Sequence, residues 1–497
     1  MRALSLPLRT IALAACLTCV LASAAYDFEV DGIYYSKNGA NATVVSGDSL
    51  YLGEVTIPST VTNEGTTYTV TAIGNNAFKE CVNLYRVDIP ASVTNIGAQA
   101  FRGCTGLTEV ILPDGITVIN DYTFQSCSNL SSINIPTGVT SIGNYAFNDC
   151  SSLLTLDIPA GVTTIGSHAF NGCASLNGIT IPEGITTVNE GTFKNCSSLT
   201  AINIPAGVTS IYSNASYHTP AFVGCTGLKT LTWNARSCSS RGAMPTGNIE
   251  RATIGDEVTL LPASFLSGSK VTDIVIPDGV TSIGSSAFRD CASLSEIILP
   301  DSVTQISGHL FYGCTSLENI VIPSAVTTIG TYAFYGCSAL KNLICRSTTP
   351  PTIESSTAIN SIRNSTNLRV PRAVIEDYQA ADLWKYFMTI VPDEYDFMVN
   401  GIYYIQTGDA TASVTYKDAD FNSYSGAINI PSKVTHNDVT YSVTGIGLEA
   451  FKNCTDMAQV SMGKKLTSVG YSAFEGCTKL DRIRIPRRCN DHRPESF

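Results

Sequence analysis

Apolar residues recur along this chain in a unit of 23 residues, the spacing that separates the prolines at positions 90, 113, 136, 159, 182 and 205. Within one unit, Leu130–Ile135 places its apolar residues on one side of an extended chain, which is typical of a β-strand. Pro136-Thr137-Gly138 follows with turn chemistry, because proline fixes φ and glycine accepts a positive φ. Next come a second extended run, V-T-x-I, and the motif A-F-x-x-C. We predict that this motif is one helical turn that packs its Phe and Cys inward.

This period predicts the fold. A unit of 23 residues cannot bury its apolar face alone, so consecutive units must stack into a solenoid. We therefore predict a leucine-rich-repeat-like solenoid, β-rich with short helical turns, in which parallel strands form a ladder closed by β-rich caps. Phenylalanine closes 13 copies of the unit, at positions 78, 101, 124, 147, 170, 193, 222, 265, 288, 311, 334, 451 and 474. The predicted structural core includes Phe101, Cys104, Phe124, Cys127, Phe147 and Cys150.

The pattern starts twice. "YDFEVDGIYY" at Tyr26–Tyr35 returns as "YDFMVNGIYY" at Tyr395–Tyr404, and a lengthened first repeat follows each copy. We predict a signal peptide at 1–25, an N-terminal β-rich cap at 26–56, the main solenoid at 57–345, a closing segment at 346–394, a second β-rich cap at 395–427 and a second, short repeat block at 428–497. The last residues, "RRCNDHRPESF", break the repeat, so we expect the second block to be truncated or frame-disrupted.

The closing segment repeats large side chains. Tyr378, Ala381, Trp384 and Phe387 recur every three positions, which favours one amphipathic helix over the open end of the core. An aromatic platform for sugar binding is the alternative interpretation.

The first 25 residues have the order of an export signal. Arg2 and Arg9 supply positive charge, Ile11–Leu21 is apolar, and Ala22-Ser23-Ala24 is a small-residue cleavage site. A lipoprotein box with Cys16 lipidated is the rival interpretation. No later stretch of about 18 apolar residues exists, so we expect no transmembrane helix in the mature chain. The net charge of −11 argues against nucleic acid as a partner, since phosphate contacts need clustered Lys and Arg.

The cysteines of the A-F-x-x-C motif, which we call the cysteine column, could bind a metal, form disulfides or catalyse redox chemistry. Metal sites need close Cys or His clusters, whereas these cysteines are single and 23 residues apart, so we expect neither metal nor cofactor. Disulfides between neighbouring coils remain an alternative, because an exported chain meets an oxidising environment. Side chains at the same position of stacked coils point in parallel, however, so their Cβ atoms stay about 4.8 Å apart. This distance is longer than the Cβ–Cβ distance that a disulfide prefers. Gly268 also replaces the thiol in one coil. These points favour buried, free thiols beside Phe.

No residue pattern supports catalysis. The five histidines have no partner cluster, and no nucleophile, zinc-protease or phosphate-loop motif occurs. We therefore expect a protein that is not an enzyme.

The repeat resembles a known family. "LTEVILPDGITVINDYTFQSC" and its sister sequences, over about 57–345 and 428–486, are similar to the leucine-rich repeats of BspA-like surface proteins. The resemblance implies a cell-surface adhesin that binds host extracellular-matrix or plasma proteins, or other bacteria. A carbohydrate-binding surface module and a structural component of the cell envelope are the alternatives.

The outward strand positions are the candidate binding surface. In L-x-x-I-x-I the third and fifth residues are expected to face solvent. The fifth residues change from polar, as in Asn134, to β-branched or aliphatic after Val271. We predict an apolar stripe with polar neighbours, and such patches mark interaction sites. The alternatives are plain β-propensity and cover by the segment 346–392. The candidate binding residues are Asp273, Val275, Glu296, Ile298, Asn319, Val321, Asn342 and Ile344.

Overall fold

The computed structural model describes residues 26–212, 219–239, 248–393, 395–417 and 423–481, together with 483 and 485. The predicted signal peptide and the residues 486–497 lie outside this described part. The chain forms two compact units. Unit 1 comprises Met1–Glu318, Thr328–Ala339 and Glu354–Ile362, and unit 2 comprises Asn319–Thr327, Leu340–Ile353 and Arg363–Phe497.

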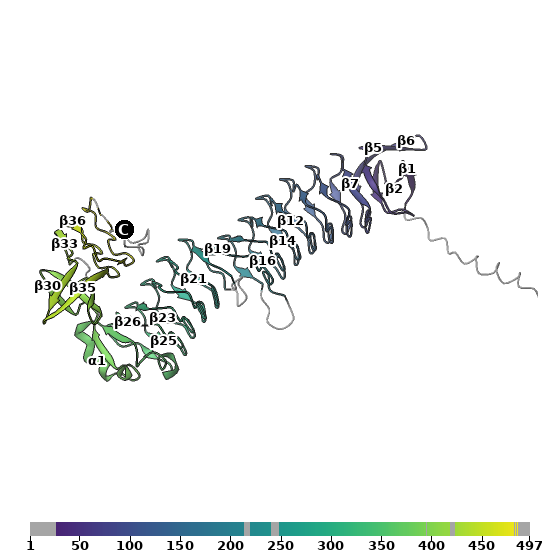
Figure 1. Cartoon of the computed structure of the whole chain (residues 1–497). Coiled ribbons are helices and arrows are strands. Elements are labelled where there is room, and N and C mark those ends of the chain that lie inside the picture. Colours follow the sequence, from purple (N-terminus) through teal and green to yellow (C-terminus); the bar gives the residue numbers. More distant parts are fainter. Residues whose placement is uncertain are drawn as a thin grey trace, which may run out of the picture. The chain divides into compact units, whose positions relative to one another are not determined.

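Unit 1 starts with a β-rich cap (Figure 1). Its sheet has the order β1-β2-β3-β6-β5, and β8 also pairs with β6. Asp31 and Gly32 join β1 to β2 with φ angles of 51° and 78°, as a tight two-residue hairpin requires. The strands of this sheet are β1 (Phe28–Val30), β2 (Ile33–Asn38), β3 (Asn41–Val45), β5 (Thr60–Asn63), β6 (Thr66–Ile73) and β8 (Asn95–Ile96).

The repeats of unit 1 stack in sequence order and form two rows of short parallel strands (Figure 1). The L-x-x-I-x-I segments give the first row: β4 (Gly53–Thr56), β7 (Leu84–Asp88), β9 (Glu109–Val110), β11 (Ser132–Ile133), β13 (Thr155–Leu156), β15 (Gly178–Ile179), β17 (Ala201–Ile204), β19 (Thr230–Trp233) and β20 (Arg251–Ile254). The V-T-x-I segments give the second row: β10 (Val118–Ile119), β12 (Ser141–Ile142), β14 (Thr164–Ile165), β16 (Thr187–Val188), β18 (Ser210–Ile211), β21 (Leu260–Leu261), β22 (Ser282–Ile283), β23 (Gln305–Ile306) and β25 (Thr328–Ile329). Unit 1 also holds the short 3-10 helix η1 (Ser356–Ala358). The predicted solenoid of parallel strands is therefore confirmed.

The A-F-x-x-C motif is not helical, so the prediction of a helical turn is wrong. Tyr122 and Ser126 both have a φ of 60°, which interrupts any helix. The Phe124 amide donates to the Ala146 carbonyl of the next coil at 2.8 Å instead of bonding within its own coil. The motif is a series of turns. Alternate backbone N–H groups point along the solenoid axis and donate hydrogen bonds to the next coil.

Phenylalanine and cysteine nevertheless face the core as predicted. Phe101, Cys104, Phe124, Cys127, Phe147 and Cys150 are all 0% exposed. The Phe101 and Phe124 rings stack with centroids 5.4 Å apart and an interplanar angle of 3°. One column of stacked rings therefore runs through successive coils and packs each coil against the next.

Unit 2 contains most of the closing segment. Its parallel sheet has the order β24-β26-β28-β29. The elements are β24 (Asn319–Ile322), β26 (Asn342–Cys345), β27 (Thr352–Ile353), β28 (Asn367–Val370), η2 (Arg372–Val374), α1 (Ile375–Ala380), η3 (Trp384–Tyr386) and β29 (Thr389–Pro392).

The helix of the closing segment is shorter than predicted. It ends at Ala380 because Ala381 is extended and Leu383 has a φ of 67°. The aromatic side chains are buried all the same: Tyr378 donates to the Ser347 carbonyl at 2.8 Å, and Trp384 Nε1 to a backbone carbonyl at 2.7 Å. These rings serve the core and offer no free platform for a sugar.

A second cap in unit 2 repeats the first. Its sheet has the order β30-β31-β32-β35-β34, with β37 paired to β35, and β33 pairs with β36. Phe397 faces Tyr404 in the same register as Phe28 faces Tyr35. The strands are β30 (Phe397–Val399), β31 (Ile402–Gly408), β32 (Thr411–Thr415), β33 (Gly426–Asn429), β34 (Lys433–His436), β35 (Val439–Ile446), β36 (Met457–Ser461) and β37 (Ser468–Val469).

Candidate binding surfaces

The part of the predicted stripe that lies in unit 1 is partly accessible. Val275 is 43% exposed and Asp273 is exposed, while Glu296 and Ile298 are half-buried. Of its two apolar residues, Val275 is exposed and Ile298 is half-buried, so the continuous apolar stripe stays a prediction.

The part of the stripe in unit 2 differs from the expectation. Asn319 is exposed, and Asn342 and Ile344 are half-buried, but Val321 is only 7% exposed. The prediction of a solvent-facing Val321 is therefore wrong. The strand period alone did not reveal that Val321 is buried, whereas Asn319 on the same strand is exposed.

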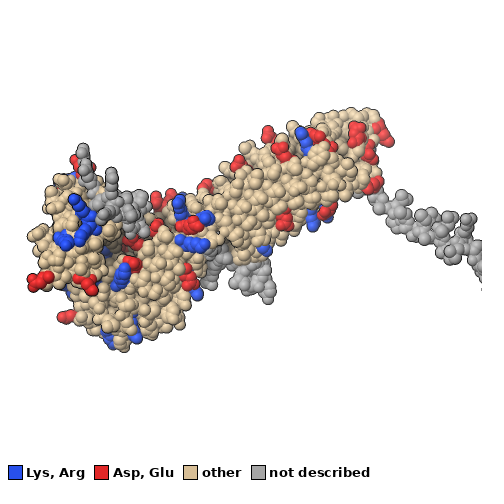
Figure 2. Space-filling view, in the orientation of Figure 1, with Lys and Arg blue, Asp and Glu red and all other residues tan. Residues whose placement is uncertain are grey.

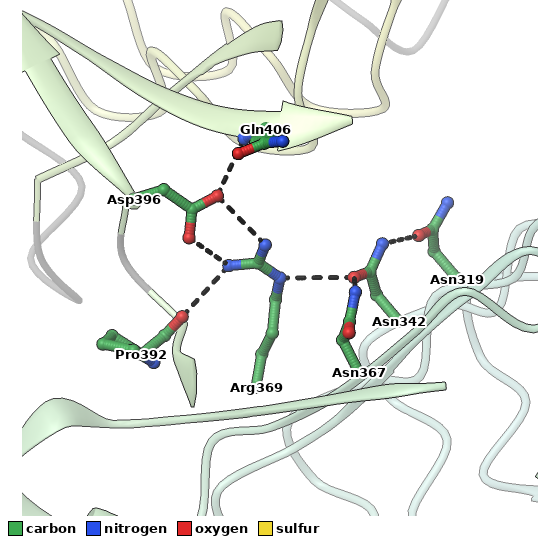
Figure 3. Close-up of polar contacts among 7 residues, drawn as sticks. All are labelled: Asn319, Asn342, Asn367, Arg369, Pro392, Asp396 and Gln406. Atoms are coloured by element: carbon green, nitrogen blue, oxygen red, sulfur yellow. Dashed lines mark hydrogen bonds and ion pairs between the residues drawn. The ribbon is translucent and has the colours of Figure 1, made fainter. Parts of the chain in front are cut away.

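A polar network lies over this sheet of unit 2 (Figure 3). Arg369 on β28 is paired with Ile344 on the neighbouring strand β26. Its Nε donates to Asn342 Oδ1 at 3.3 Å. Its other nitrogens donate to the Pro392 carbonyl at 3.0 Å and form an ion pair with Asp396 at 3.3 Å. The Arg369 side chain is 5% exposed. A cation so deeply buried needs this carboxylate and these carbonyl oxygens.

Asparagines extend the network along the strands (Figure 3). Asn342 Nδ2 donates to Asn319 Oδ1 at 2.8 Å, and Asn367 Nδ2 donates to Asn342 Oδ1 at 3.4 Å. The backbone N–H of Gln406 donates to Asp396 Oδ2 at 2.7 Å. Asn342 therefore has internal partners, so it is a poor residue for binding a ligand. Sequence reasoning missed this network because Arg369 and Asp396 belong to different predicted segments.

A cluster of aromatic residues lies on the turns of unit 1, and we call it the aromatic cluster. It consists of Arg289, His309, Tyr312, Tyr332 and Tyr335. The Tyr312 and Tyr335 rings stack at 5.3 Å, and the His309 and Tyr332 rings stack at 5.0 Å. The Arg289 guanidinium lies 4.7 Å from the Tyr312 ring centroid. Tyr332 and Tyr335 are 37% and 41% exposed. This concentration of exposed rings was missed in the sequence because its members belong to three coils; the signal was their fixed place relative to the Phe–Cys motif.

Earlier coils carry a narrower stack at the same turn position. The Tyr122 and Tyr145 rings lie 4.9 Å apart at an angle of 5°, and the Tyr145 and His168 rings lie 4.7 Å apart at 7°. Burial lowers the pKa of His168, which favours the neutral form of this ring. The faces of these rings contact one another, so the stack contributes to coil packing.

The cysteine column has a structural role. In most repeats the thiol donates to the backbone carbonyl of a phenylalanine in the preceding coil: Cys104 Sγ lies 2.9 Å from the Phe78 oxygen and Cys127 Sγ lies 3.1 Å from the Phe101 oxygen. The cysteines in the described part of the chain are free thiols. Burial raises the pKa of Cys127 to about 12, and that of Cys104 also lies well above the usual range. Such thiols stay protonated and are poor nucleophiles.

The described residues also bear on metal binding and on membrane crossing. Those residues contain no group of three His, Cys, Asp or Glu side chains placed to hold a metal ion. Within the same residues, no helix combines the length and the apolar character that a membrane crossing needs.

Stacked coils, two rows of parallel strands and a Phe–Cys core define a leucine-rich-repeat solenoid, a class of scaffold that generally binds proteins. The sequence matches the family described as "BspA type Leucine rich repeat region (6 copies)" over residues 71–171, 140–270, 259–379 and 426–497. The chain therefore belongs to the BspA-type leucine-rich repeat family, whose members are bacterial surface proteins.

Solved structures also match this chain. A leucine-rich repeat protein from Bacteroides ovatus is 26% identical, with 93% of this chain and 95% of that chain covered and a TM-score of 0.45. A leucine-rich cell surface protein from Faecalibacterium prausnitzii is 28% identical, with 75% and 98% covered and a TM-score of 0.38. The pneumococcal vaccine antigen PcpA is 20% identical, with 74% and 98% covered and a TM-score of 0.33. No curated protein matches the chain.

Proposed function

We propose that this chain is an exported, non-catalytic adhesin of the bacterial cell surface that binds another protein. Its partner is a host extracellular-matrix or plasma protein, or a protein on another bacterium. The observation that carries the proposal is the aromatic cluster of unit 1, where exposed tyrosines and an arginine gather on a rigid scaffold.

The composition of the cluster favours a protein partner. Tyrosine and arginine are enriched among the residues that dominate the binding energy of protein interfaces. Each ring of the cluster is held by its neighbours, as Tyr332 is by Tyr335 at 5.6 Å, so little side-chain freedom is lost on binding. The stripe residues Val275 and Ile298 offer a second apolar contact on the strand side.

A sugar is a weaker candidate. Sugar rings stack on a free aromatic face, whereas the faces of Tyr312 and Tyr335 contact each other. The fifth strand positions hold small or β-branched residues instead of aromatic ones. A structural envelope role would instead require self-assembly of the chain without any other ligand.

A binding screen tests the proposal. Residues 26–497 are presented to immobilised matrix proteins, plasma proteins, bacterial cells and a glycan array. We expect selective, saturable binding to a protein, and the double variant Y332S/Y335S should weaken it at least about tenfold. Y85S removes a tyrosine of unit 1 that is 53% exposed but lies outside the cluster, and should leave the affinity unchanged.

Three results would overturn parts of this proposal. Binding to glycans alone would replace the protein partner by a carbohydrate. Self-association as the sole interaction would favour the envelope role. Equal affinity of Y332S/Y335S and the unaltered chain would remove the aromatic cluster, and the variant V275T/I298T would then test the stripe.

A further inference from the structure

A groove in the N-terminal cap forms a second candidate site. It has a volume of about 440 Å³. Its lining comes from two segments of unit 1. The first is Val30–Ile33, at the turn between β1 and β2, together with Tyr35, and the second consists of residues between Ser49 and Pro58, which include most of β4. The aromatic cluster lies on distant coils, so the groove is a separate site.

One wall of the groove is the open edge of a strand. Among the described residues, β4 pairs only with β7. The Ile57 amide donates to the Asp88 carbonyl at 3.0 Å, on the β7 side. Since backbone groups alternate along a strand, the N–H and C=O groups of Glu54 and Thr56 point away from β7. Both residues line the groove, so their backbone groups are available to another extended chain.

Two leucines at the groove are exposed. Leu50 is 57% and Leu52 is 69% exposed, whereas Tyr51 between them is buried. Tyr51 anchors the segment, because its hydroxyl donates to the Val45 carbonyl at 2.7 Å and accepts from the Tyr34 amide at 3.0 Å. With Tyr51 turned inward, its two neighbours must turn outward.

The second cap shows that the fold does not require these leucines. Tyr424 occupies the place of Tyr51, since its hydroxyl accepts from the Tyr403 amide at 3.1 Å and donates to the Thr415 carbonyl. Its neighbours are Ser423 and Ser425. The same structure is thus built with serines in unit 2 and with exposed leucines in unit 1. Exposed leucines that a fold does not need are a mark of an interaction site.

The groove is also acidic. Residues 26–58 carry five acidic side chains and one basic one, a formal charge of −4 (one minus five). Asp31 and Glu54 line the groove, and Glu54 forms an ion pair with Arg86 at 3.3 Å. Figure 2 shows acidic side chains gathered at this end of unit 1. This charge favours a cationic ligand.

We propose that this groove binds an extended segment of a partner protein, which adds as a strand to the open edge of β4. The segment places an aliphatic side chain against Leu50 and Leu52, and a Lys or Arg beside Asp31. Strand addition derives affinity from backbone hydrogen bonds and specificity from alternate side chains, and the groove offers both.

A synthetic peptide tests the proposal directly. The probe is a short fluorescent peptide in which lysine and valine alternate, added to residues 26–497 at low salt. We expect saturable binding that weakens as salt is added, because the lysine–Asp31 attraction is screened. Hydrogen exchange should show slower exchange of the Glu54 and Thr56 amides when the peptide is bound. A peptide with proline at alternate positions lacks the required N–H groups and should not bind.

Variants assign the binding to the groove. L50S/L52S copies the serines of the second cap, so it should fold, and it should weaken peptide binding about tenfold. D31N should weaken binding about threefold and reduce its salt dependence. L154S is the matched control, because Leu154 is 52% exposed on unit 1 outside the groove. Absence of saturable binding, equal binding of the proline peptide, or unchanged affinity of L50S/L52S would each overturn the proposal.

Discussion

In most repeats a hydrogen bond explains the choice of cysteine. Cys150 Sγ lies 3.1 Å from the Phe124 carbonyl and Cys173 Sγ lies 3.2 Å from the Phe147 carbonyl, so the contact recurs from coil to coil. A thiol is small and apolar enough for this core, yet it still donates weakly to a carbonyl that would otherwise have one partner fewer. The sequence predicted burial of this residue, but it did not predict the bond.

These buried thiols predict sensitivity to alkali. The pKa of Cys127 is raised by burial from its ordinary value of 9.0 to about 12, so the folded state disfavours the thiolate. Thiols of the unfolded chain lose their protons above pH 9, so the stability that the thiols contribute is present below that pH and is lost as the pH rises towards 12. Urea unfolding followed by circular dichroism at about pH 7 and about pH 10.5 should show this loss.

A variant with fewer thiols provides the control. C127A/C150A is expected to be less stable at neutral pH by about 1–2 kcal/mol for each site, since each loses a hydrogen bond and leaves a small cavity. It should, however, lose less additional stability on going to alkaline pH. An equal loss in both proteins would show that tyrosines or lysines cause the effect.

At the scale of elements, unit 2 shows how one side chain joins neighbouring segments. Arg369 extends from β28 and contacts Asn342 on β26, the Pro392 carbonyl on β29, and Asp396 just before β30. The sequence predicted a cap after the closing segment from the repeated "YDF" motif. It could not predict this contact, because no local pattern marks an arginine that will be buried.

Loss of this arginine should destabilise unit 2. We expect R369A to lower its free energy of unfolding by about 2–3 kcal/mol, because Asp396 and the Pro392 carbonyl lose a buried partner. Thermal and urea unfolding of residues 26–497 measure the effect. K385A removes an exposed ion pair with Asp382 in the same unit and should cause no measurable loss. Equal stability of R369A and K385A would contradict a structural role for the network.

At the scale of the whole molecule, the chain consists of two caps, two series of repeats and a closing segment, arranged in two units. Each coil is bound to its sequence neighbours, as the amide of Thr140 donates to Thr117 and the amide of Thr163 to Thr140, both at 2.9 Å. Such a solenoid behaves nearly as a one-dimensional system, in which a coil is stabilised by the coils on either side.

Removal of one complete coil should therefore be tolerated. Deletion of Ser128–Cys150 removes 23 residues and joins Cys127 to Ser151, which keeps the repeat in phase. We expect a folded chain with a slightly smaller denaturant dependence of unfolding, because less surface is exposed when it unfolds. Deletion of Ser128–Ile135 alone shifts the later strands out of register and should disrupt unit 1. Circular dichroism and size-exclusion chromatography distinguish the results. Equal damage from both deletions would contradict this independence of coils.

The sequence alone determined the repeat, the solenoid, the parallel strands, the Phe–Cys core and the two caps, because these follow from spacings within a single 23-residue unit. It failed for the turn around Phe124, because hydrogen bonds to the next coil override the local preference. It also failed for Val321, whose exposure depends on what lies over the strand. The Arg369 network and the groove beside Leu50 were decided by the tertiary structure alone, because each brings together residues from separate segments and no spacing within one repeat encodes that proximity. The aromatic cluster had a signal in the fixed place of its rings relative to the Phe–Cys motif, but its contacts lie between coils and needed the structure.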